Sequence, residues 1–393
     1  MADRTEARPG PLSGLRVLDF TALLQGPLAT QILADCGADV VKLEKHDGEW
    51  MRQWGIFMTR THGETDAFLA FNRNKRSVEI DLRDAEDRER IFRLVDRADV
   101  VVENFRPGVM DRAGLGYEVL HKRNPRLIYA ASSGYGRTGP YANRPGQDYL
   151  VQALTGAMWL TGRRDDPPLL FGAAIADQFT GLHLVVGILA ALHHRERTGA
   201  GQRVDVDLLS CMMAIQQQEL TVFFNHGLPM ERPVENVGHP GITAPCGVYA
   251  TSDGHLMLAM FPCPKLGEIL KVDWLAQYDT NEKMFAARDV VHRLLTKHFA
   301  TQTTAHWIEL LTAHDVWCAP VQRHADLERD PQIAHKKLIW EVPCAQGGAT
   351  YRTVGSPFTF SAGDVGVRRG APRSGEHTEA FRQGTIWKEP NDD

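Results

Sequence analysis

The fold is decided by residues 14–44, which read GLRVLDFTALLQGPLATQILADCGADVVKLE. Short apolar runs rich in branched side chains open and close this stretch, at 14–20 and at 39–44. Between them, apolar residues recur at the spacing of a helix. A strand, a helix and a second strand in this order are typical of a parallel sheet with crossover helices. The stretch therefore predicts an α/β fold.

The same alternation continues along the first half of the chain. Further strand-like segments occupy 77–82, 99–105, 126–132 and 202–209, and helical segments occupy 84–97, 177–195 and a stretch ending near 224. From this pattern we expect one large domain of parallel strands and helices over residues 1–225.

The regular alternation of strand-like and helical segments ends after residue 226. Two strand-like runs surround Asp253 and Gly254 within residues 247–260, which predicts a hairpin. Helical segments at 265–272, 287–300 and 303–314 and a strand at 316–322 follow. We expect a smaller α+β domain over residues 226–325. The C-terminal segment 326–393 is rich in Gly, Pro and Arg and contains the strand-like runs TYRTV and FTFS.

Composition narrows the class of protein. The length of 393 residues suggests two to three domains, and 44 Lys and Arg against 49 Asp and Glu give a net charge of −5, spread along the chain. A nucleic-acid-binding protein would carry a basic excess. The longest apolar run, residues 184–192, is about half of a membrane span, and the amino terminus has no apolar signal segment. We expect no nucleic-acid partner and no membrane span.

Cysteine spacing and the familiar motifs exclude several chemistries. The six cysteines lie far apart, without the paired spacing of a zinc site. Free thiols of this kind are typical of a reducing compartment, so we expect a cytoplasmic protein without a metal. The first strand–helix turn, which contains Gly26 and Pro27, lacks the dinucleotide-binding motif G-x-G-x-x-G, and the motifs G-x-x-x-x-G-K-[ST], H-E-x-x-H and G-x-S-x-G are absent. A dinucleotide oxidoreductase, a P-loop NTPase, a zinc protease and a serine hydrolase are therefore disfavoured.

Polar residues suited to a phosphorylated ligand recur at the ends of successive predicted strands. They are Lys45, Asn72, Lys75, Arg83, Asn104, Arg106 and Arg112. The carboxyl ends of parallel strands form the ligand-binding edge of an open α/β sheet, and Arg and Lys pair well with phosphate. Each residue alone is more often a solvated surface charge, so only their recurrence predicts a site.

One loop carries a candidate nucleophile. The segment LTGRRDDPPLL, residues 160–170, places Asp165 and Asp166 between two apolar segments. A carboxylate can form a covalent intermediate with an activated acyl group. A turn-forming Asp before Pro is the alternative, and composition alone favours it. Asp148 and Asp177 precede helical patterns and have the alternative role of helix caps.

Several motifs in a fixed order carry a resemblance to a known family. They are LSGLRVLDFT and GPLATQILADCGADVVKLEK near the amino terminus, then FNRNKRSVEIDL, VVENFRPGVMDRAGLGYEVL, SSGYGRTGPYANRPGQD and GILAALHHRERTGAGQRVDVDLL. In these the chain resembles the family III CoA transferases, the formyl-CoA, carnitine and bile-acid group that also contains the α-methylacyl-CoA racemases. The resemblance covers residues 12–260 and is weaker beyond. It implies a Rossmann-like large domain built from both chain ends, a small α+β domain and an interlocked homodimer.

The resemblance also implies roles for individual residues. The nucleophile falls on Asp165 in GRRDDPP, and Tyr135 matches a tyrosine that lines the acyl site. The implied contacts to coenzyme A are Leu24, Gln25, Lys45, Ile80, Arg83, Asn104, Phe105 and Arg112. A small-domain loop that is a run of glycines in formyl-CoA transferases reads ENVGHPG here, which does not favour formyl or oxalyl specificity. Gly238 and His239 in this loop are candidate substrate contacts, although a histidine beside proline is more often structural.

The implied reaction moves CoA from an acyl-CoA thioester to a carboxylic acid through an aspartyl anhydride and an aspartyl–CoA thioester. The racemase branch instead pairs a histidine, directly before the aspartate of a G-H-D motif, with an aspartate that matches Asp177. Here that motif reads Gly146-Gln147-Asp148, and a glutamine amide cannot exchange protons near neutral pH. A transferase is therefore favoured over a racemase, with a non-catalytic acyl-CoA-binding protein as a third alternative. The acyl donor and the acid acceptor stay open.

Overall fold

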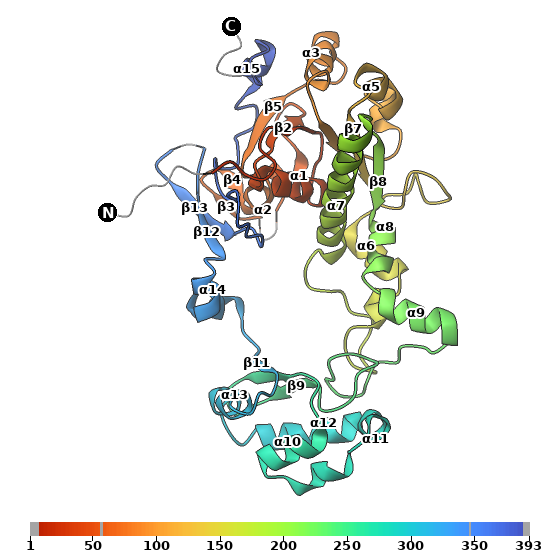
Figure 1. Ribbon diagram of the computed structural model, residues 1–393, viewed down its shortest axis with the longest axis vertical. Coiled ribbons are helices and arrows are strands. Elements are labelled where there is room, and N and C mark those ends of the chain that lie inside the picture. Colours follow the sequence, from red (N-terminus) through yellow and green to blue (C-terminus); the bar gives the residue numbers. More distant parts are fainter. Residues whose placement is uncertain (1–7, 56–57, 346, 388–393) are drawn as a thin grey trace. The chain divides into compact units, whose positions relative to one another are not determined.

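The structure is a computed structural model that describes residues 8–55, 58–345 and 347–387 (Figure 1). The chain divides into two compact units. The large unit comprises residues 1–151, 174–215 and 331–393, and the small unit comprises residues 152–173 and 216–330. The chain therefore leaves the large unit twice and returns to it each time.

A six-stranded sheet in the order β5-β2-β1-β6-β7-β8 forms the centre of the large unit. Its strands are β1 (Arg16–Asp19), β2 (Asp39–Glu44), β5 (Lys75–Glu79), β6 (Val100–Glu103), β7 (Ile128–Ser133) and β8 (Arg203–Asp207). All neighbouring strands pair in parallel. The strand order reverses between β1 and β6, which is the topological switch point of a Rossmann-like sheet. The predicted α/β fold is confirmed.

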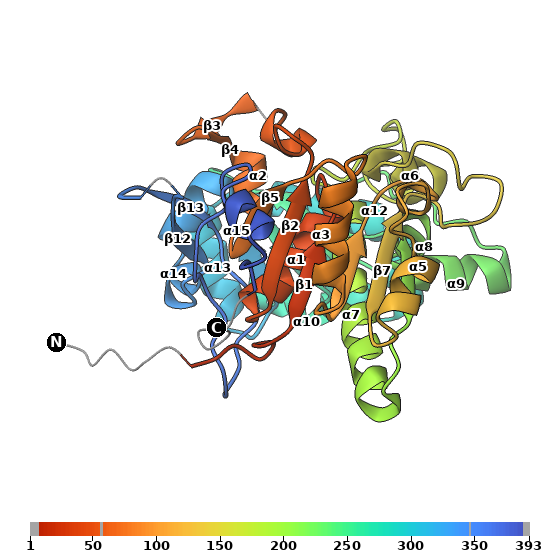
Figure 2. The same cartoon turned by 90° about the horizontal axis from the view of Figure 1, so that it is seen from above.

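Helices cover both faces of this sheet because alternate strand residues point to opposite sides. Leu18 and Val101 belong to one buried cluster, whereas their neighbours Val17 and Val100 belong to another. The first cluster is completed by α3 (Ala85–Val95), α5 (Tyr117–Arg123) and α15 (Thr378–Arg382), and the second by α1 (Gln25–Asp35) and α7 (Ile175–Thr198). Figure 2 shows this sheet and its helices from above.

Local chemistry explains where these helices begin and end. Helix α3 begins after Asp84, whose carboxylate accepts hydrogen bonds from the amides of Glu86 and Asp87. Helix α7 ends at Gly199, which takes the left-handed conformation with φ of 77°. Within the described residues, α7 is the one helix long and apolar enough to cross a membrane. It packs against α1 and β7, and such packing is typical of a core helix in an α/β fold.

The remaining elements of the large unit lie around the sheet. They are η1 (Trp50–Arg52), β3 (Arg60–Thr61), β4 (Glu64–Thr65), α2 (Asp66–Phe71), α4 (Val109–Arg112), α8 (Leu208–Ala214), α14 (Pro331–His335), β12 (Ile339–Pro343) and β13 (Thr350–Val354). Helix α6 (Asp148–Leu154) begins in the large unit, and its last three residues belong to the small unit. The C-terminal segment covers edge strand β5, where the His377 amide donates to the Ser77 carbonyl at 2.8 Å. A covered edge cannot pair with another chain.

The small unit has its own core. Strands β11 (Cys318–Pro320), β10 (His255–Leu258) and β9 (Gly247–Ala250) form an antiparallel sheet in this order. Around it lie η3 (Ala157–Trp159), α9 (Gln217–His226), α10 (Cys263–Leu270), η4 (Asp273–Gln277), α11 (Asn281–Ala286), α12 (Arg288–Phe299), α13 (Thr304–Thr312) and η5 (His324–Arg329). Tyr249, Leu295 and Trp307 are among its buried residues. The predicted hairpin at Asp253 and Gly254 is confirmed.

Two local predictions are wrong. The run FTFS, residues 358–361, forms no strand, since no neighbouring strand within the described ranges pairs with it. The single helix predicted to end near 224 is instead two helices, α8 and α9, separated at Ile215 and Gln216. This break coincides with the passage of the chain from the large unit to the small unit.

Candidate active site

The loops that follow β1 and β6 meet at the switch point of the sheet. The Oδ1 atom of Asn104 accepts a hydrogen bond from the Ala22 amide at 2.9 Å, and its Nδ2 atom donates to the Ala22 carbonyl at 2.8 Å. A carboxamide makes both bonds at once because it carries a donor and an acceptor. Asn104 therefore lies against the loop that leads to Leu24 and Gln25. Open α/β sheets bind their ligands at this crevice.

The start of α1 presents unused backbone donors. The Gln25 Oε1 atom accepts a hydrogen bond from the Ser132 hydroxyl of β7 at 2.6 Å, which fixes the first residue of the helix. No acceptor in the described parts of the chain bonds the amides of Leu24, Gln25 and Gly26. Free amides at a helix N-terminus favour a negatively charged group. Leu24 and Gln25 thus lie where an anionic ligand atom would be stabilised.

Helix α7 passes very close to this helix start. A Cβ atom on Gly181 would lie 2.7 Å from the carbonyl oxygen of Gln25, so the contact requires glycine. Asp177 lies one helical turn before Gly181 and therefore on the same face of α7. The structure thus brings Asp177 to the side of the site formed by Gln25.

The Asp177 residue is half-buried, and its carboxyl lies near a second carboxyl group. Its own amide donates a hydrogen bond to Oδ2 of the buried Asp148 at 2.9 Å. Burial and, secondly, the charge of Asp148 raise the pKa of Asp177 to about 7. A carboxyl with a raised pKa beside strand-end loops is typical of a nucleophile or a base. The sequence contained a signal for it, namely the racemase motif that matched Asp177.

Two glycines bring the segment before α6 to the end of β7. Gly134 and Gly146 touch backbone to backbone, and a Cβ on either residue would collide with the other. The following Gln147 is exposed, and its Oε1 atom accepts the amide of Tyr149 at 3.2 Å. Tyr135 is half-buried beside Gly134, and its ring meets that of Tyr141 edge-on with centroids 5.8 Å apart. Tyr135 thus lies on a loop that adjoins the segment of Asp148.

The prediction from the sequence that Lys75 and Asn72 are phosphate ligands is wrong. The Lys75 Nζ atom is fully buried, forms an ion pair with Asp19 at 3.0 Å and donates to Oδ1 of Asn72 at 2.8 Å. A buried ammonium must be paired in this way, and burial lowers the pKa of Lys75 to about 8. Lys75 and Asn72 therefore belong to the core below the loop.

Three other predicted contacts lie at the ends of β2 and β5, on the far side of β1 from β6. Lys45 is exposed directly after β2. Ile80 is buried, and its amide donates to the Glu44 carbonyl at 2.8 Å. Arg83 is exposed and its guanidinium pairs with Asp81 at 2.9 Å. Hydrogen bonds do not connect these residues to the loop of Ala22 within the described ranges.

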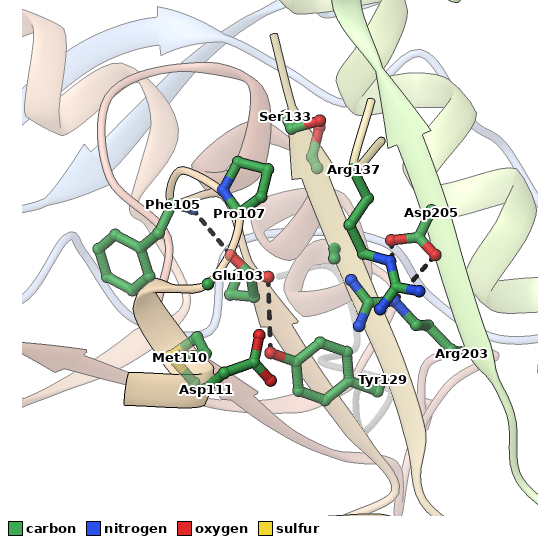
Figure 3. A pocket seen from close by; sticks show the side chains of 13 residues that line it. Glu103, Phe105, Pro107, Met110, Asp111, Tyr129, Ser133, Arg137, Arg203 and Asp205 are labelled. Carbon is green, nitrogen blue, oxygen red and sulfur yellow. Dashed lines mark hydrogen bonds and ion pairs between the residues drawn. The ribbon is translucent and has the colours of Figure 1, made fainter. Parts of the chain in front are cut away.

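A small polar pocket lies beside the switch point, between β6, β7 and β8 (Figure 3). Its volume of about 20 Å³ suits one or two water molecules. The Glu103 carboxylate accepts the amide of the half-buried Phe105 at 2.8 Å and lies 3.5 Å from the Tyr129 hydroxyl. Burial raises the pKa of Glu103 to about 7. Arg112 ends the neighbouring helix α4 and is exposed.

Asp165 lies in the small unit, exposed in a turn. The buried Arg232 holds this turn from below, since its guanidinium donates to the carbonyls of Thr161 and Pro167 at 3.0 Å each and also to that of Asp166. The neighbouring Asp166 accepts the Arg163 amide at 2.8 Å. Within the described ranges no group hydrogen-bonds the exposed Asp165 carboxylate, which lies on a loop held by Arg232.

Gly238 and His239 also lie in the small unit. The His239 Nε2 atom is 2.9 Å from Oε1 of Glu219 in α9, and its Nδ1 atom accepts the Gly241 amide at 3.0 Å. The ring is therefore a donor at Nε2, and both nitrogens are engaged within the loop. Gly238 is exposed, and a Cβ there would approach Cys246 and Met257 at 3.2 Å.

The described ranges contain no group of three or more His, Cys, Asp or Glu side chains that could hold a metal ion. All six cysteines are free thiols.

Comparison with known proteins identifies the chain. Residues 12–378 match CoA-transferase family III. The chain is 37% identical over 382 residues to succinyl-CoA:mesaconate CoA-transferase from Haloarcula hispanica, which covers 94% of each chain. It is 37% identical over 393 residues to succinate–glutarate CoA-transferase from Agrobacterium fabrum, which covers 96% of each chain.

A solved structure agrees with these matches. The crystal structure of a CaiB/BaiF family protein from Brucella suis superposes with a TM-score of 0.85 at 35% identity, covering 96% of this chain and 100% of the other. A shared fold together with this identity over nearly the whole chain excludes a chance likeness. The protein belongs to CoA-transferase family III and is an enzyme that transfers CoA between an acyl-CoA and a carboxylic acid.

Proposed function

We propose that the enzyme transfers CoA through covalent aspartyl intermediates and that Asp177 is the attacking carboxylate. The observation that carries this proposal is the position of Asp177 in the first turn of α7, one turn from the contact of Gly181 with Gln25. Burial makes the carboxylate a stronger nucleophile when it is ionised, because its charge is poorly solvated. The pKa of about 7 leaves a large ionised fraction at neutral pH.

The exchange balances without a further reactant. The Asp177 carboxylate attacks the thioester carbonyl carbon, and the C–S bond breaks. This step releases CoA thiolate and forms a mixed anhydride between Asp177 and the acyl group. The thiolate attacks the aspartyl carbonyl, which releases the first acid and leaves an aspartyl–CoA thioester. The acceptor carboxylate attacks that thioester, forms a second anhydride and expels CoA thiolate. Attack of the thiolate on the acceptor's acyl carbon then gives the new acyl-CoA and restores Asp177.

The surroundings of Asp177 suit these steps. Each addition to a carbonyl produces a negatively charged oxygen, and a preorganised amide donor is often worth about 3 kcal/mol to such a transition state. The amides of Leu24, Gln25 and Gly26 are available donors at the helix start. We propose that Leu24, Gln25 and Asn104, with Phe105 beyond them, contact coenzyme A, and that Lys45, Ile80, Arg83 and Arg112 lie along its nucleotide end.

Asp165 is the alternative nucleophile. Its supporting observation is an exposed carboxylate on a loop held by Arg232, in the GRRDDPP sequence that the family resemblance points to. We would incubate the protein with succinyl-CoA, trap acyl and thioester adducts with hydroxylamine or borohydride, and map them by peptide mass spectrometry. An adduct on Asp177, with Asp177→Asn slowing exchange about a thousandfold and Asp165→Asn within about threefold, is the expected result. An adduct on Asp165 with the opposite pattern would assign the chemistry to Asp165.

The substrates are proposed as small carboxylic acids and their CoA thioesters, because the two relatives compared above act on succinyl-CoA, mesaconate, succinate or glutarate. Tyr135, Gly238 and His239 are proposed to contact the acyl group. The racemase alternative predicts deuterium exchange at the α-carbon of a 2-methylacyl-CoA. Gln147 speaks against it, because neither its amide nor its engaged carbonyl exchanges a proton near neutral pH.

We further propose a cytoplasmic homodimer. Leu182, Val186 and Leu189 recur along one face of α7 and are 41%, 57% and 41% exposed. An apolar stripe of this kind is typical of a surface that a partner chain covers. Light scattering after size exclusion tests the dimer, and a stable monomer at micromolar concentration would exclude it.

A further inference from the structure

The loop between β1 and α1 has a backbone conformation that needs support. Leu23 takes a left-handed conformation with φ of 69° although it has a side chain, and that side chain is 42% exposed. Such a conformation costs roughly 1–3 kcal/mol and persists only where neighbouring groups enforce it. Packing of a side chain this exposed supplies only part of that energy. The hydrogen bonds of the loop backbone add to it.

A glutamate from another segment holds Leu23. The Glu49 Oε2 atom accepts the Leu23 amide at 2.7 Å. Glu49 precedes η1, and its own amide donates to the side chain of Glu44 at 2.9 Å, which fixes its position. Glu49 is only 5% exposed, so its bond to Leu23 does not compete with water.

A buried lysine completes the support. The Lys42 Nζ atom lies 3.2 Å from Oε1 of Glu49 and donates to the carbonyl of Thr21 at 2.6 Å. Lys42 is fully buried within β2. Lys42 therefore donates to the carbonyl of Thr21, and Glu49 accepts the amide of Leu23. Ala22 lies between these two residues, and its own amide and carbonyl bond Asn104.

Stability alone does not explain this pair. Two buried charges lose their hydration, and an apolar pair of similar volume often stabilises a fold equally well or better. Here each member directs a hydrogen bond to a named backbone atom of the loop. We propose that the Lys42–Glu49 pair positions residues 21–24 and thereby sets where α1 presents its free amides and Gln25 to the CoA thioester. This inference deepens the proposed function and rests on its placement of CoA at Leu24 and Gln25.

The experiment replaces the pair without leaving a lone charge. The double variant Lys42→Met with Glu49→Leu keeps the volume and removes both bonds to the loop. Asp35→Asn is the control, because Asp35 and Arg73 form an equally buried pair at 2.6 Å that does not touch residues 20–25. Glu49→Gln tests rescue, since its amide oxygen can still accept the Leu23 amide. The readouts are hydrogen exchange of the peptide spanning 20–25, and KM and kcat with succinyl-CoA.

We expect the double variant to fold. The amides of Ala22 and Leu23 should exchange at least about tenfold faster than in the wild type. KM for the acyl-CoA should rise about tenfold, and kcat should change less than about threefold. Glu49→Gln should recover most of both effects, and Asp35→Asn should show neither. Unchanged exchange in the double variant would overturn the inference whatever the kinetics. Faster exchange with an unchanged KM would support the positioning of the loop and overturn the placement of CoA on it.

Discussion

The amide of Asp177 donates a 2.9 Å hydrogen bond to Oδ2 of Asp148, so one carboxylate anchors the helix turn that carries the other. The same contact brings a buried negative charge close to the Asp177 carboxyl, which helps to raise its pKa. Asp148 therefore acts on Asp177 both mechanically and electrostatically. The first role needs only an oxygen acceptor, whereas the second needs a charge, so the two can be separated by substitution.

Replacing Asp148 with asparagine keeps an oxygen acceptor and removes the charge. Because that charge raises the pKa of Asp177, the pKa should fall below about 7 in Asp148→Asn. Ionised Asp177 then persists to lower pH, so the acid limb of kcat/KM should move to lower pH. The pH profile of CoA exchange measures this shift. Asp84→Asn, at the exposed cap of α3, should leave the limb in place, and an unmoved limb in Asp148→Asn would contradict the coupling.

Glu103 predicts a pH-dependent stability. Its folded pKa of about 7 lies above the ordinary value of 4.5, so the folded state binds the proton more tightly than the unfolded state. Its contribution to stability is therefore complete below pH 4.5 and is lost as the pH rises towards about 7. Glu103→Gln keeps an acceptor for the Phe105 amide and should be more stable than the wild type at pH 8 by roughly 1–3 kcal/mol. Urea unfolding at pH 5 and pH 8 measures this, with Glu86→Gln, on the exposed side of α3, as control.

Gly181 should tolerate no side chain. In Gly181→Ala the new Cβ meets the backbone oxygen of Gln25 at 2.7 Å, so α1 and α7 must separate. We expect a loss of about 1–3 kcal/mol in unfolding free energy and a higher KM for acyl-CoA. Gly187 in the same helix is the comparison, because its Cβ would also lie 2.7 Å from a neighbouring atom, but that atom is a side-chain methyl of Val204 and not backbone. Gly187→Ala should therefore lose less unfolding free energy than Gly181→Ala and leave KM unchanged, and equal effects in both variants would contradict this explanation.

Arg232 should control the loop of Asp165. Lysine cannot reach several carbonyls at once, because it lacks the planar fork of arginine. In Arg232→Lys the loop should open more often, and native-state trypsin should cut after Arg163 or Arg164 about tenfold faster. The cleavage site is identified by mass spectrometry. Arg293→Lys, in an exposed ion pair with Glu235, is the control and should leave the cleavage rate unchanged.

The sequence by itself determined the layers of the large unit. Strands such as β1 and β6 are short apolar runs separated by helical periodicity, and this pattern depends only on local residue order. It also indicated Asn104, since strand ends are visible in the sequence, whereas Leu24 and Gln25 followed only from the family resemblance. The run FTFS shows the limit of such reasoning, because a strand forms only where a partner strand is available.

Tertiary structure alone decided which polar residues are available for chemistry. Lys75 looked like a phosphate ligand, but an ion pair with Asp19 buries it, and that pairing joins residues far apart in the sequence. Asp177 looked like a helix cap, and only the approach of α7 to α1 at Gly181 brings it to the site. Burial and the distance between charges arise from packing of distant segments, so a linear pattern cannot reveal which carboxyl group is desolvated or which backbone loop a buried charge supports.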